Sequence, residues 1–247
     1  MRPIAMAAAV ALLLVWSGAS AQPIPNSSQR PDFALVLSGG GARGLAYVGV
    51  LRAFEEARIA PDLLVGCSMG AVVGALYASG YSPQEIEELT RVLDWNALFS
   101  GERSGRYRGV TEAREHRPGL FTLYLSGERG LEMDRTLASS AGPQEIYARY
   151  TLPAEFAAGG DFDFLGVPLR AAAADLRTGR LIFLDGGSLA RAMTASSAVP
   201  LVFEPVEADS FVLVDGGMLD NFPVTHAHEL GARVIVGVDV ARPFKTG

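Results

Sequence analysis

The residue best placed for nucleophilic chemistry is Ser68, at the centre of the run Gly66-Cys67-Ser68-Met69-Gly70. A serine in this pattern lies on a sharp turn between a strand and a helix, where its hydroxyl can attack a carbonyl carbon. Side chains at the two glycine positions would clash in so tight a turn. The helix that follows would also point its positive end at charge that develops near Ser68. The run therefore predicts a serine nucleophile.

A serine hydroxyl needs a base, and the sequence offers two kinds. Asp215 follows an apolar run over 211–214, and Gly216 and Gly217 let the chain turn away beside its carboxylate. The alternative is a Ser-His-Asp triad that recruits His226 or His228, two of the chain's three histidines. Those two histidines lie two residues apart in a predicted helix, so they belong on different faces. A turn aspartate that bonds its own backbone is the purely local interpretation of Asp215.

A glycine-rich loop precedes Ser68 in the chain, with the sequence Gly39-Gly40-Gly41-Ala42-Arg43-Gly44. It follows a short apolar run and precedes a predicted helix, so free backbone N–H groups in the loop would form an anion site. The spacing also fits a dinucleotide fingerprint, but that interpretation expects an acidic residue at the end of the next strand, about 20 residues on. Asp62 stands before that strand instead. A purely structural turn is the remaining alternative.

The elements around these residues alternate between strands and helices, which is typical of an α/β domain with a parallel or mixed sheet covered on both faces. Because the carboxyl ends of parallel strands meet at one edge, we expect the three motifs to converge there. Ser82 is a suitable N-cap for a helix that begins at Pro83, with Glu85 completing a capping box. Residues from about Trp95 to Asp163 are irregular and mixed in composition. We expect strands over 33–37, 63–65, 168–173, 180–184, 211–214 and 233–240, and helices over 45–57, 70–78, 83–93 and 224–230.

With these motifs in order, residues Phe33 to Val240 resemble the patatin-like phospholipase family. The resemblance rests on the glycine loop, the Ser68 turn and Asp215-Gly216-Gly217. It extends to three further stretches, over 194–200, 203–206 and 220–224. The fold it implies is a three-layer α/β/α sandwich with a mostly parallel central sheet.

The resemblance also implies roles for individual residues. Ser68 would be the nucleophile and Asp215 its partner in a Ser-Asp dyad without histidine. The N–H groups of Gly40 and Gly41 would form the oxyanion hole, and no cofactor would be needed. The supporting motif residues are Gly39, Arg43, Gly44, Gly66, Gly70, Gly216 and Gly217.

The ends of the chain predict export. Residues 1–21 have the basic start, apolar core and small-residue cleavage site of a signal peptide, residues 22–31 form a linker, and residues 32–247 form the acyl hydrolase domain. We expect the product in the periplasm, at the outer membrane or secreted, and it is similar to the passenger domains of type V patatin-like autotransporters. Loss of Arg2 changes the net charge from −6 to −7, so a nucleic-acid partner is disfavoured. The lone Cys67 permits no internal disulfide, and we expect it to be buried.

The expected substrate is a phospholipid or another acyl lipid, cleaved by phospholipase A-type chemistry. The alternatives are a general carboxylesterase with a Ser-His-Asp triad and a catalytically silent binding domain. The histidines and the cysteine lack the spacing of metal ligands. Peripheral contact with anionic membranes is a further hypothesis. It rests on apolar residues at Trp95, Leu98, Phe99 and 120–125, and on arginines at 103, 106, 108, 114 and 117.

Overall fold

The structure is a computed structural model, and it describes residues 31–93, 122–126, 130–134, 138–208 and 210–241. The predicted signal peptide, most of the linker and the proposed membrane-facing residues Trp95, Leu98 and Phe99 lie outside these ranges. Among the described helices, none combines the length and the apolar composition needed to cross a bilayer.

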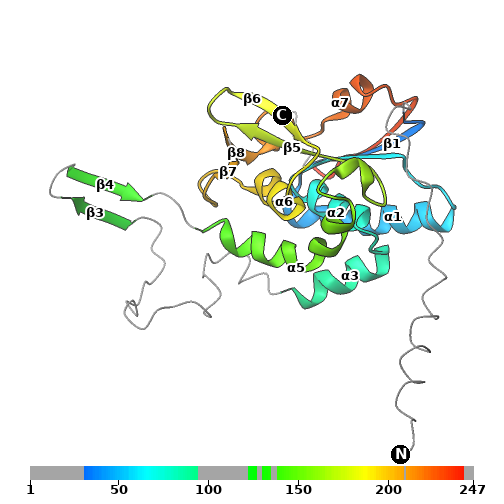
Figure 1. Cartoon of the computed structure of the whole chain (residues 1–247), viewed down its shortest axis with the longest axis horizontal. Coiled ribbons are helices and arrows are strands. Elements are labelled where there is room, and N and C mark those ends of the chain that lie inside the picture. The colour runs from blue at the N-terminus through cyan, green and yellow to red at the C-terminus, as the bar shows by residue number, and fades with distance from the viewer. Residues whose placement is uncertain (1–30, 94–121, 127–129, 135–137, 209, 242–247) are drawn as a thin grey trace, which may run out of the picture.

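A seven-stranded mixed sheet forms the centre of the fold (Figure 1). Strands β9, β1, β2 and β5 run parallel to one another in that order, whereas β6 and β8 both pair antiparallel with β5. Strands β1 and β2 are continuously apolar, as expected for strands with both faces covered. The strands are β1 (Phe33–Leu37), β2 (Leu63–Cys67), β5 (Leu169–Asp175), β6 (Arg180–Leu184), β7 (Val206–Ala208), β8 (Phe211–Asp215) and β9 (Val234–Val238).

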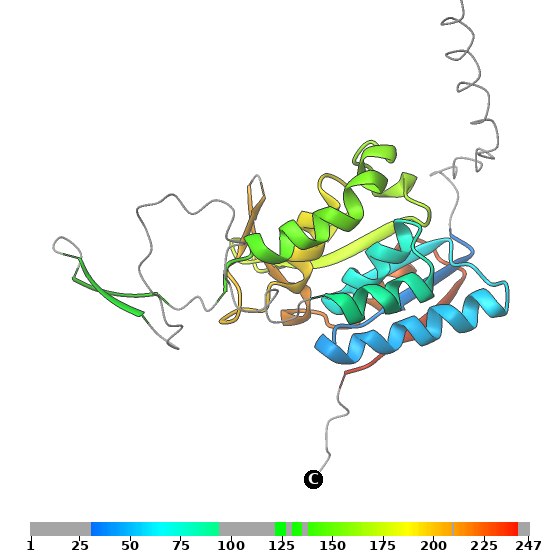
Figure 2. The ribbon, with the colours of Figure 1, turned by 90° about the horizontal axis from the view of Figure 1, so that it is seen from below.

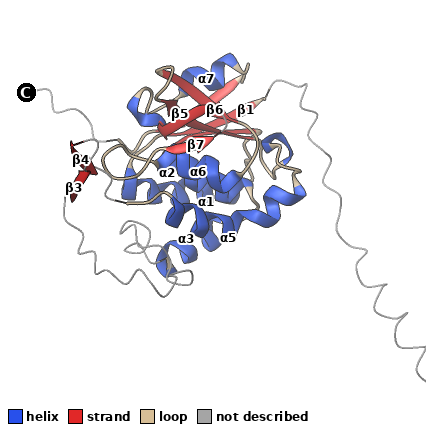
Figure 3. Ribbon diagram, turned by 60° about the vertical axis from the view of Figure 1, so that its left-hand side comes forward, coloured by secondary structure: helices blue, strands red, loops and turns tan. Residues whose placement is uncertain are grey.

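Helices cover both faces of this sheet unequally. Figure 3 shows α1, α2, α3, α5 and α6 on one face and α7 on the other. In Figure 2 the green α5, the teal α3 and the blue α1 lie across the thicker layer. The three-layer α/β/α prediction is therefore confirmed. The helices are α1 (Tyr47–Glu56), α2 (Met69–Ala78), α3 (Pro83–Val92), α5 (Ala141–Ala157), α6 (Leu189–Ser197) and α7 (Val224–Glu229), with short 3-10 turns at η1 (Gly41–Ala46), η2 (Phe162–Phe164) and η3 (Gly216–Met218).

Strand β1 shows how the core is divided between the two faces. Leu35 and Leu37 pack into the large cluster under α2, α5 and α6, while Ala34 and Val36 pack toward α7. All four side chains are fully buried. The alternation follows from the two-residue period of a strand, so a single continuous apolar run serves both layers.

Most of the elements predicted from the sequence are present, including the capping box of α3. The Ser82 hydroxyl accepts the N–H of Glu85, and the Glu85 carboxylate accepts the N–H of Ser82. The expectation of an irregular segment from Trp95 to Asp163 is wrong, because α5 occupies part of it. Prolines disfavour a helix there, and Pro153 lies inside α5. Pro143, however, lies in the tolerated first turn, and α5 packs against α6.

Helix α6 and the strands β3 (Thr122–Ser126), β4 (Gly130–Asp134) and β7 are also missing from the sequence-based prediction. Helix α6 is rich in small residues, and nearly all of it is buried, so it shows no clear alternation of polar and apolar faces. A separate antiparallel hairpin joins β3 to β4.

Candidate active site

Ser68 occupies the junction between β2 and α2, as the sequence predicts. Its backbone lies in the left-handed region, at φ 53° and ψ −124°, and the residue is 9% exposed. A β-carbon at Gly66 would lie 2.6 Å from the Cα atom of Ala71, and one at Gly70 would collide with the carbonyl oxygen of Leu37. Strain of this kind at a nucleophile position is maintained only where the surrounding structure enforces it. The two glycines are therefore a steric requirement of the turn.

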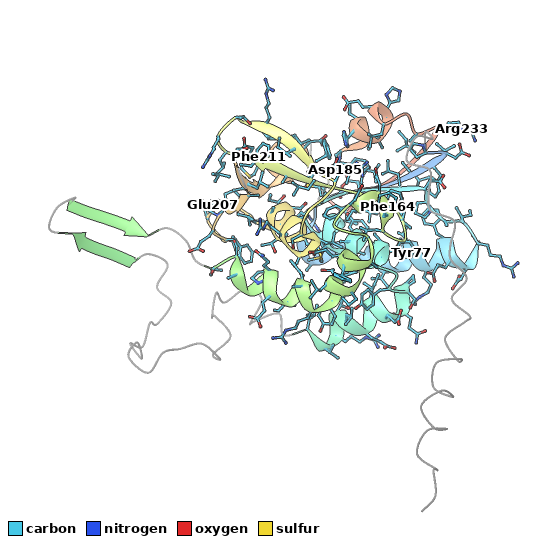
Figure 4. All side chains as sticks on the ribbon, in the orientation of Figure 1. Tyr77, Phe164, Asp185, Glu207, Phe211 and Arg233 are labelled. Atoms are coloured by element: carbon cyan, nitrogen blue, oxygen red, sulfur yellow. The ribbon has the colours of Figure 1, made fainter. Side chains whose placement is uncertain are left out.

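Asp215 reaches Ser68 by a route that the sequence does not predict. Ala172 pairs with Cys67 of β2, the next residue Ala173 pairs with Asp215 of β8, and both also pair with β6. Since β6 occupies one edge of β5, strands β2 and β8 share the other edge and meet end to end. The expectation that Asp215 ends a strand parallel to β2 is thus wrong, because β8 arrives from the opposite direction. Figure 4 shows Phe211, where β8 begins, on the far side of the molecule from Arg233 beside β9.

The carboxylate of Asp215 is held by two donors and lies beside Ser68. The N–H of Gly217 donates to Oδ1 at 2.8 Å, and the Cys67 thiol lies 3.8 Å from the same oxygen. The Ser68 side chain also lowers the pKa of Asp215. Burial raises the pKa of Asp215 above its ordinary value, and these hydrogen bonds offset part of the increase. The raised pKa brings the carboxylate closer to the basicity that proton transfer at neutral pH requires.

The turn after Asp215 also depends on glycine. A β-carbon at Gly216 would lie 2.6 Å from the carbonyl oxygen of Ala172, so only glycine lets the chain pass β5 this closely. Gly217 supplies the N–H that fixes Asp215 Oδ1. Asp215 therefore accepts a hydrogen bond from its own turn, as the local interpretation expects, and it also lies beside Ser68.

The glycine loop lies beside Ser68, between β1 and η1. The N–H of Gly39 donates to the carbonyl of Asn221 at 2.9 Å, whereas the N–H groups of Gly40 and Gly41 have no acceptor among the described residues. Gly41 has φ +55°, in the region that favours glycine, and it lines the same cavity as Ser68. These two N–H groups are the ones available to a bound anion.

The remaining loop residues shape its surroundings. A β-carbon at Gly40 would lie 2.5 Å from Val240 Cγ2, and one at Gly44 would collide with Met69 beside the nucleophile. Arg43 is exposed, and its backbone N–H closes the loop onto Gly40 at 3.3 Å.

Ser196 is a site residue to which the sequence analysis assigns no role. Its hydroxyl accepts the N–H of Ser68 at 2.9 Å and donates to the carbonyl of Ala172 at 2.6 Å. Ser196 is fully buried on α6. It lies within the stretch 194–200 that contributes to the family resemblance, and this was the only signal in the sequence.

A cavity of about 210 Å³ opens beside Ser68, between α5 and α6. Most of its lining is apolar, so it can accept a hydrocarbon chain next to the nucleophile. The lining residues are Gly41, Ser68, Met69, Pro143, Tyr147, Thr194, Ser197, Ala198, Val199, Val202 and Phe203.

Of the two histidines of α7, His226 is engaged away from Ser68. The His226 ring stacks on Phe183 with centroids 3.4 Å apart, and its Nδ1 lies 3.5 Å from a Glu229 carboxylate oxygen. Burial lowers the pKa of His226. Phe183 packs in the cluster under α7, on the opposite face of the sheet from α2. His228 is exposed, and His116 lies outside the described residues. Within the described ranges, no cluster of three or more histidine, cysteine or acidic residues is arranged to hold a metal.

Comparison with known proteins gives a consistent match. A family model described as "Patatin-like phospholipase" matches residues 35–228. "Patatin-like phospholipase domain-containing protein 6" of Mus musculus is 29% identical over 217 residues, which cover 86% of this chain and 14% of that protein. "Lysophospholipase nte1" of Aspergillus oryzae is 31% identical over 206 residues, covering 83% of this chain and 12% of that protein. The chain thus spans a small part of the length of these relatives.

Among solved structures, VipD from Legionella pneumophila aligns with a TM-score of 0.49 and 16% sequence identity. The alignment covers 79% of this chain and 47% of VipD.

Proposed function

Because the chain belongs to the patatin-like phospholipase family, we propose that it is a lipid acyl hydrolase of the phospholipase A type. The observation that carries the proposal is the position of Ser68, on the strand-to-helix turn, beside the buried carboxyl of Asp215, whose pKa the Ser68 side chain lowers. A serine with a carboxylate base is the minimum needed for acyl transfer through a covalent intermediate. The name of the fungal relative, a lysophospholipase, supports a lipid substrate.

The proposed reaction has two halves. As Ser68 Oγ bonds to the ester carbonyl carbon, Asp215 accepts the hydroxyl proton, and the N–H groups of Gly40 and Gly41 stabilise the oxyanion. The bond to the alcohol oxygen then breaks, and that oxygen takes the proton from Asp215. In the second half, water gives a proton to Asp215 and attacks the acyl-enzyme. Ser68 leaves with that proton, and a fatty acid is released.

The cavity beside Ser68 supports an acyl substrate. It is lined mainly by Met69, Tyr147, Val202, Phe203 and neighbouring apolar atoms, and it adjoins the nucleophile. Burial of a hydrocarbon chain there would contribute about 0.8 kcal/mol per methylene. A chain bound in this cavity would place its ester carbonyl between Ser68 and the glycine loop.

A Ser-His-Asp carboxylesterase is the second candidate. It would require His226 or His228 to approach Ser68, and the stack of His226 on Phe183 counts against it. A catalytically silent binding domain is the third. The intact Ser68 and Asp215 weigh against that interpretation, as do two N–H groups of the glycine loop that find no acceptor in the part of the chain that the structure describes.

The proposal includes export and membrane contact, both of which rest on the sequence alone. Residues 1–21 would direct the chain to the periplasm, the outer membrane or the medium. The arginines between 103 and 117 would bind anionic headgroups at about 1 kcal/mol per well-placed residue. Charge reversal at Arg106 and Arg108 should weaken binding to anionic vesicles while hydrolysis of a short soluble ester stays constant. Unchanged vesicle binding would remove the membrane proposal.

The function is tested with the full chain and defined phospholipids, lysophospholipids and triacylglycerols, with products identified by mass spectrometry. Fatty acid release is expected, and Ser68→Ala should reduce it by about 10⁴-fold or more. A fluorophosphonate should label Ser68 in the wild type. Asp215→Asn should lose most activity, whereas His226→Ala and His228→Ala should retain it. Loss of activity in a folded histidine variant, with Asp215→Asn only mildly affected, would return the chain to the triad hydrolases.

A further inference from the structure

Asn221 lies between the glycine loop and the turn that follows Asp215. Its backbone carbonyl accepts the N–H of Gly39 at 2.9 Å, and its side-chain Nδ2 donates to the carbonyl of Gly39 at 3.1 Å. The same residue therefore contacts both polar groups of Gly39, and the Gly39 carbonyl also accepts a hydrogen bond from the Ser38 hydroxyl at 3.1 Å. It comes from the segment between η3 and α7, 182 residues further along the chain.

The side chain of Asn221 also fills the space that two glycines leave open. A β-carbon at Gly39 would collide with Asn221 Oδ1, and one at Gly217 would lie 2.7 Å from the same atom. Gly217 is the residue whose N–H holds the Asp215 carboxylate. Asn221 Oδ1 is thus packed against the backbone of both motifs, which fixes the distance between the glycine loop and the carboxylate.

The contact with the Gly39 carbonyl has a geometric consequence for the next residue. The carbonyl of Gly39 and the N–H of Gly40 belong to one planar trans peptide group, so they point in opposite directions. Because Asn221 Nδ2 fixes the carbonyl on its own side, the N–H of Gly40 is directed away from Asn221. That N–H has no acceptor among the described residues. Glycine has little steric preference to hold this orientation by itself.

We propose that Asn221 is a positioning residue that orients the Gly39–Gly40 peptide group. In this orientation the Gly40 N–H faces the oxyanion and keeps a fixed position relative to Asp215. The inference rests on the proposed function, because it assigns a purpose to the orientation of the oxyanion loop. Asn221 touches neither the substrate nor the reacting atoms. It acts through Gly39 and Gly217.

The catalytic test compares Asn221→Asp and Asn221→Ala with the wild type on a short soluble ester. Asn221→Asp keeps the shape of the side chain and removes the donor, while Asn221→Ala also removes the packing. Both should lower kcat by about 10- to 100-fold, less than the ~10²–10³ for loss of a donor itself. KM should change by less than about threefold, because the oxyanion forms only in the transition state. Thr225→Ala, at an exposed position of α7, is the matched surface control.

A second measurement separates positioning from a general loss of structure. A trifluoromethyl ketone that forms a tetrahedral adduct with Ser68 should lose affinity in both variants in proportion to kcat. A merely structural role would instead lower the folded fraction and leave the affinity of the folded molecules unchanged. Equal kcat and equal ketone affinity in folded Asn221→Asp and wild type would overturn the inference, with the proposed function intact.

A third measurement does not depend on activity. Amide hydrogen exchange over residues 38–44 should be faster in Asn221→Ala than in the wild type, since the loop loses the side-chain hydrogen bond to the Gly39 carbonyl. Exchange over α1 should be unaffected. An inactive wild type would reject the proposed function but not the role of Asn221. Unchanged exchange over residues 38–44 in Asn221→Ala would reject the role of Asn221, whatever the activity.

Discussion

The hydroxyl of Ser196 joins the nucleophile turn to β5, 2.9 Å from the N–H of Ser68 and 2.6 Å from the carbonyl oxygen of Ala172. It thereby satisfies two buried backbone groups at the point where β2 and β8 meet. Ser196→Ala would remove the hydroxyl partner of both groups, at a cost of about 1–3 kcal/mol in the free energy of unfolding. We also expect kcat to fall, because the strained backbone of Ser68 loses a contact that holds it.

The Ser196 prediction is measured by urea unfolding and by ester hydrolysis on the same preparations. Ser79→Ala is a suitable control, since it removes a hydroxyl that donates to the Ala75 carbonyl at the far end of α2. The control should keep full activity. A Ser196→Ala protein with wild-type stability and wild-type kcat would contradict the role of this hydroxyl.

A second prediction concerns the stability cost of the buried Asp215 carboxylate. Burial raises the pKa of Asp215 in the folded state above its ordinary value of 3.8. Between those two pKa values the folded state keeps a proton that the unfolded chain has lost, so stability falls as pH rises through that window. Asn in this position carries no such cost. Asp215→Asn should therefore raise Tm at neutral pH, and the gain should shrink as the pH falls through that window and be lost below the ordinary value.

Asp175 provides a control of opposite sign on the same strand pair. Hydrogen bonds, first from the Thr178 side chain and then from the N–H of Val212, lower the pKa of Asp175. A lowered pKa contributes stability above the ordinary value, and that stability is lost in acid. Asp175→Asn should accordingly lower Tm at neutral pH, with a smaller effect in acid. The Asp215 prediction fails if Asp215→Asn lowers Tm at neutral pH in the way that Asp175→Asn does.

The sequence predicts the α/β fold well because its strands and turns are encoded locally. Leu63 to Cys67 is apolar throughout, and the backbone that Gly66 must clear, at Gly70 and Ala71, lies in the same short window. The capping box at Ser82 is equally local. In contrast, the direction of β8 depends on which edge of β5 remains unpaired. That is a property of the assembled sheet. The sequence therefore predicts that Asp215 lies near Ser68, but it predicts the wrong direction for the strand that carries Asp215.

The supporting residues of the candidate site could not be predicted for a related reason. Ser196 and Asn221 act across 128 and 182 residues of sequence, and their side chains are of types that are common in turns and on surfaces. Their contacts with Ser68 and Gly39 appear only after α6 and the segment before α7 are packed. The catalytic roles of Ser68, Asp215 and Gly40 remain predictions that the experiments above address.

The last prediction uses the contact between Cys67 and Asp215. Burial, followed by the charge of Asp215, raises the pKa of the Cys67 thiol, so the thiol stays protonated and donates toward Asp215 Oδ1 at 3.8 Å. This donor lowers the pKa of Asp215 against the larger effect of burial. Cys67→Ala removes the donor, and the pKa of Asp215 should rise further. Since Asp215 must be ionised to accept the proton of Ser68, the acid limb of the kcat/KM profile should move to higher pH.

Cys67→Ser should shift the acid limb of the kcat/KM profile in the opposite direction to Cys67→Ala. A hydroxyl is a stronger donor than a thiol, so it should stabilise the carboxylate and move the acid limb to lower pH than in Cys67→Ala. A short uncharged ester serves as the substrate, so that no ionisation of a lipid headgroup enters the profile. Each variant also loses some packing, and Cys67→Ala should cost about 1 kcal/mol in stability, which urea unfolding measures separately from the pH profile. An acid limb that stays in place in both variants would mean that the thiol does not influence the base. A limb that follows an imidazole near pH ~6.5, and disappears with His226→Ala, would assign the proton to histidine instead.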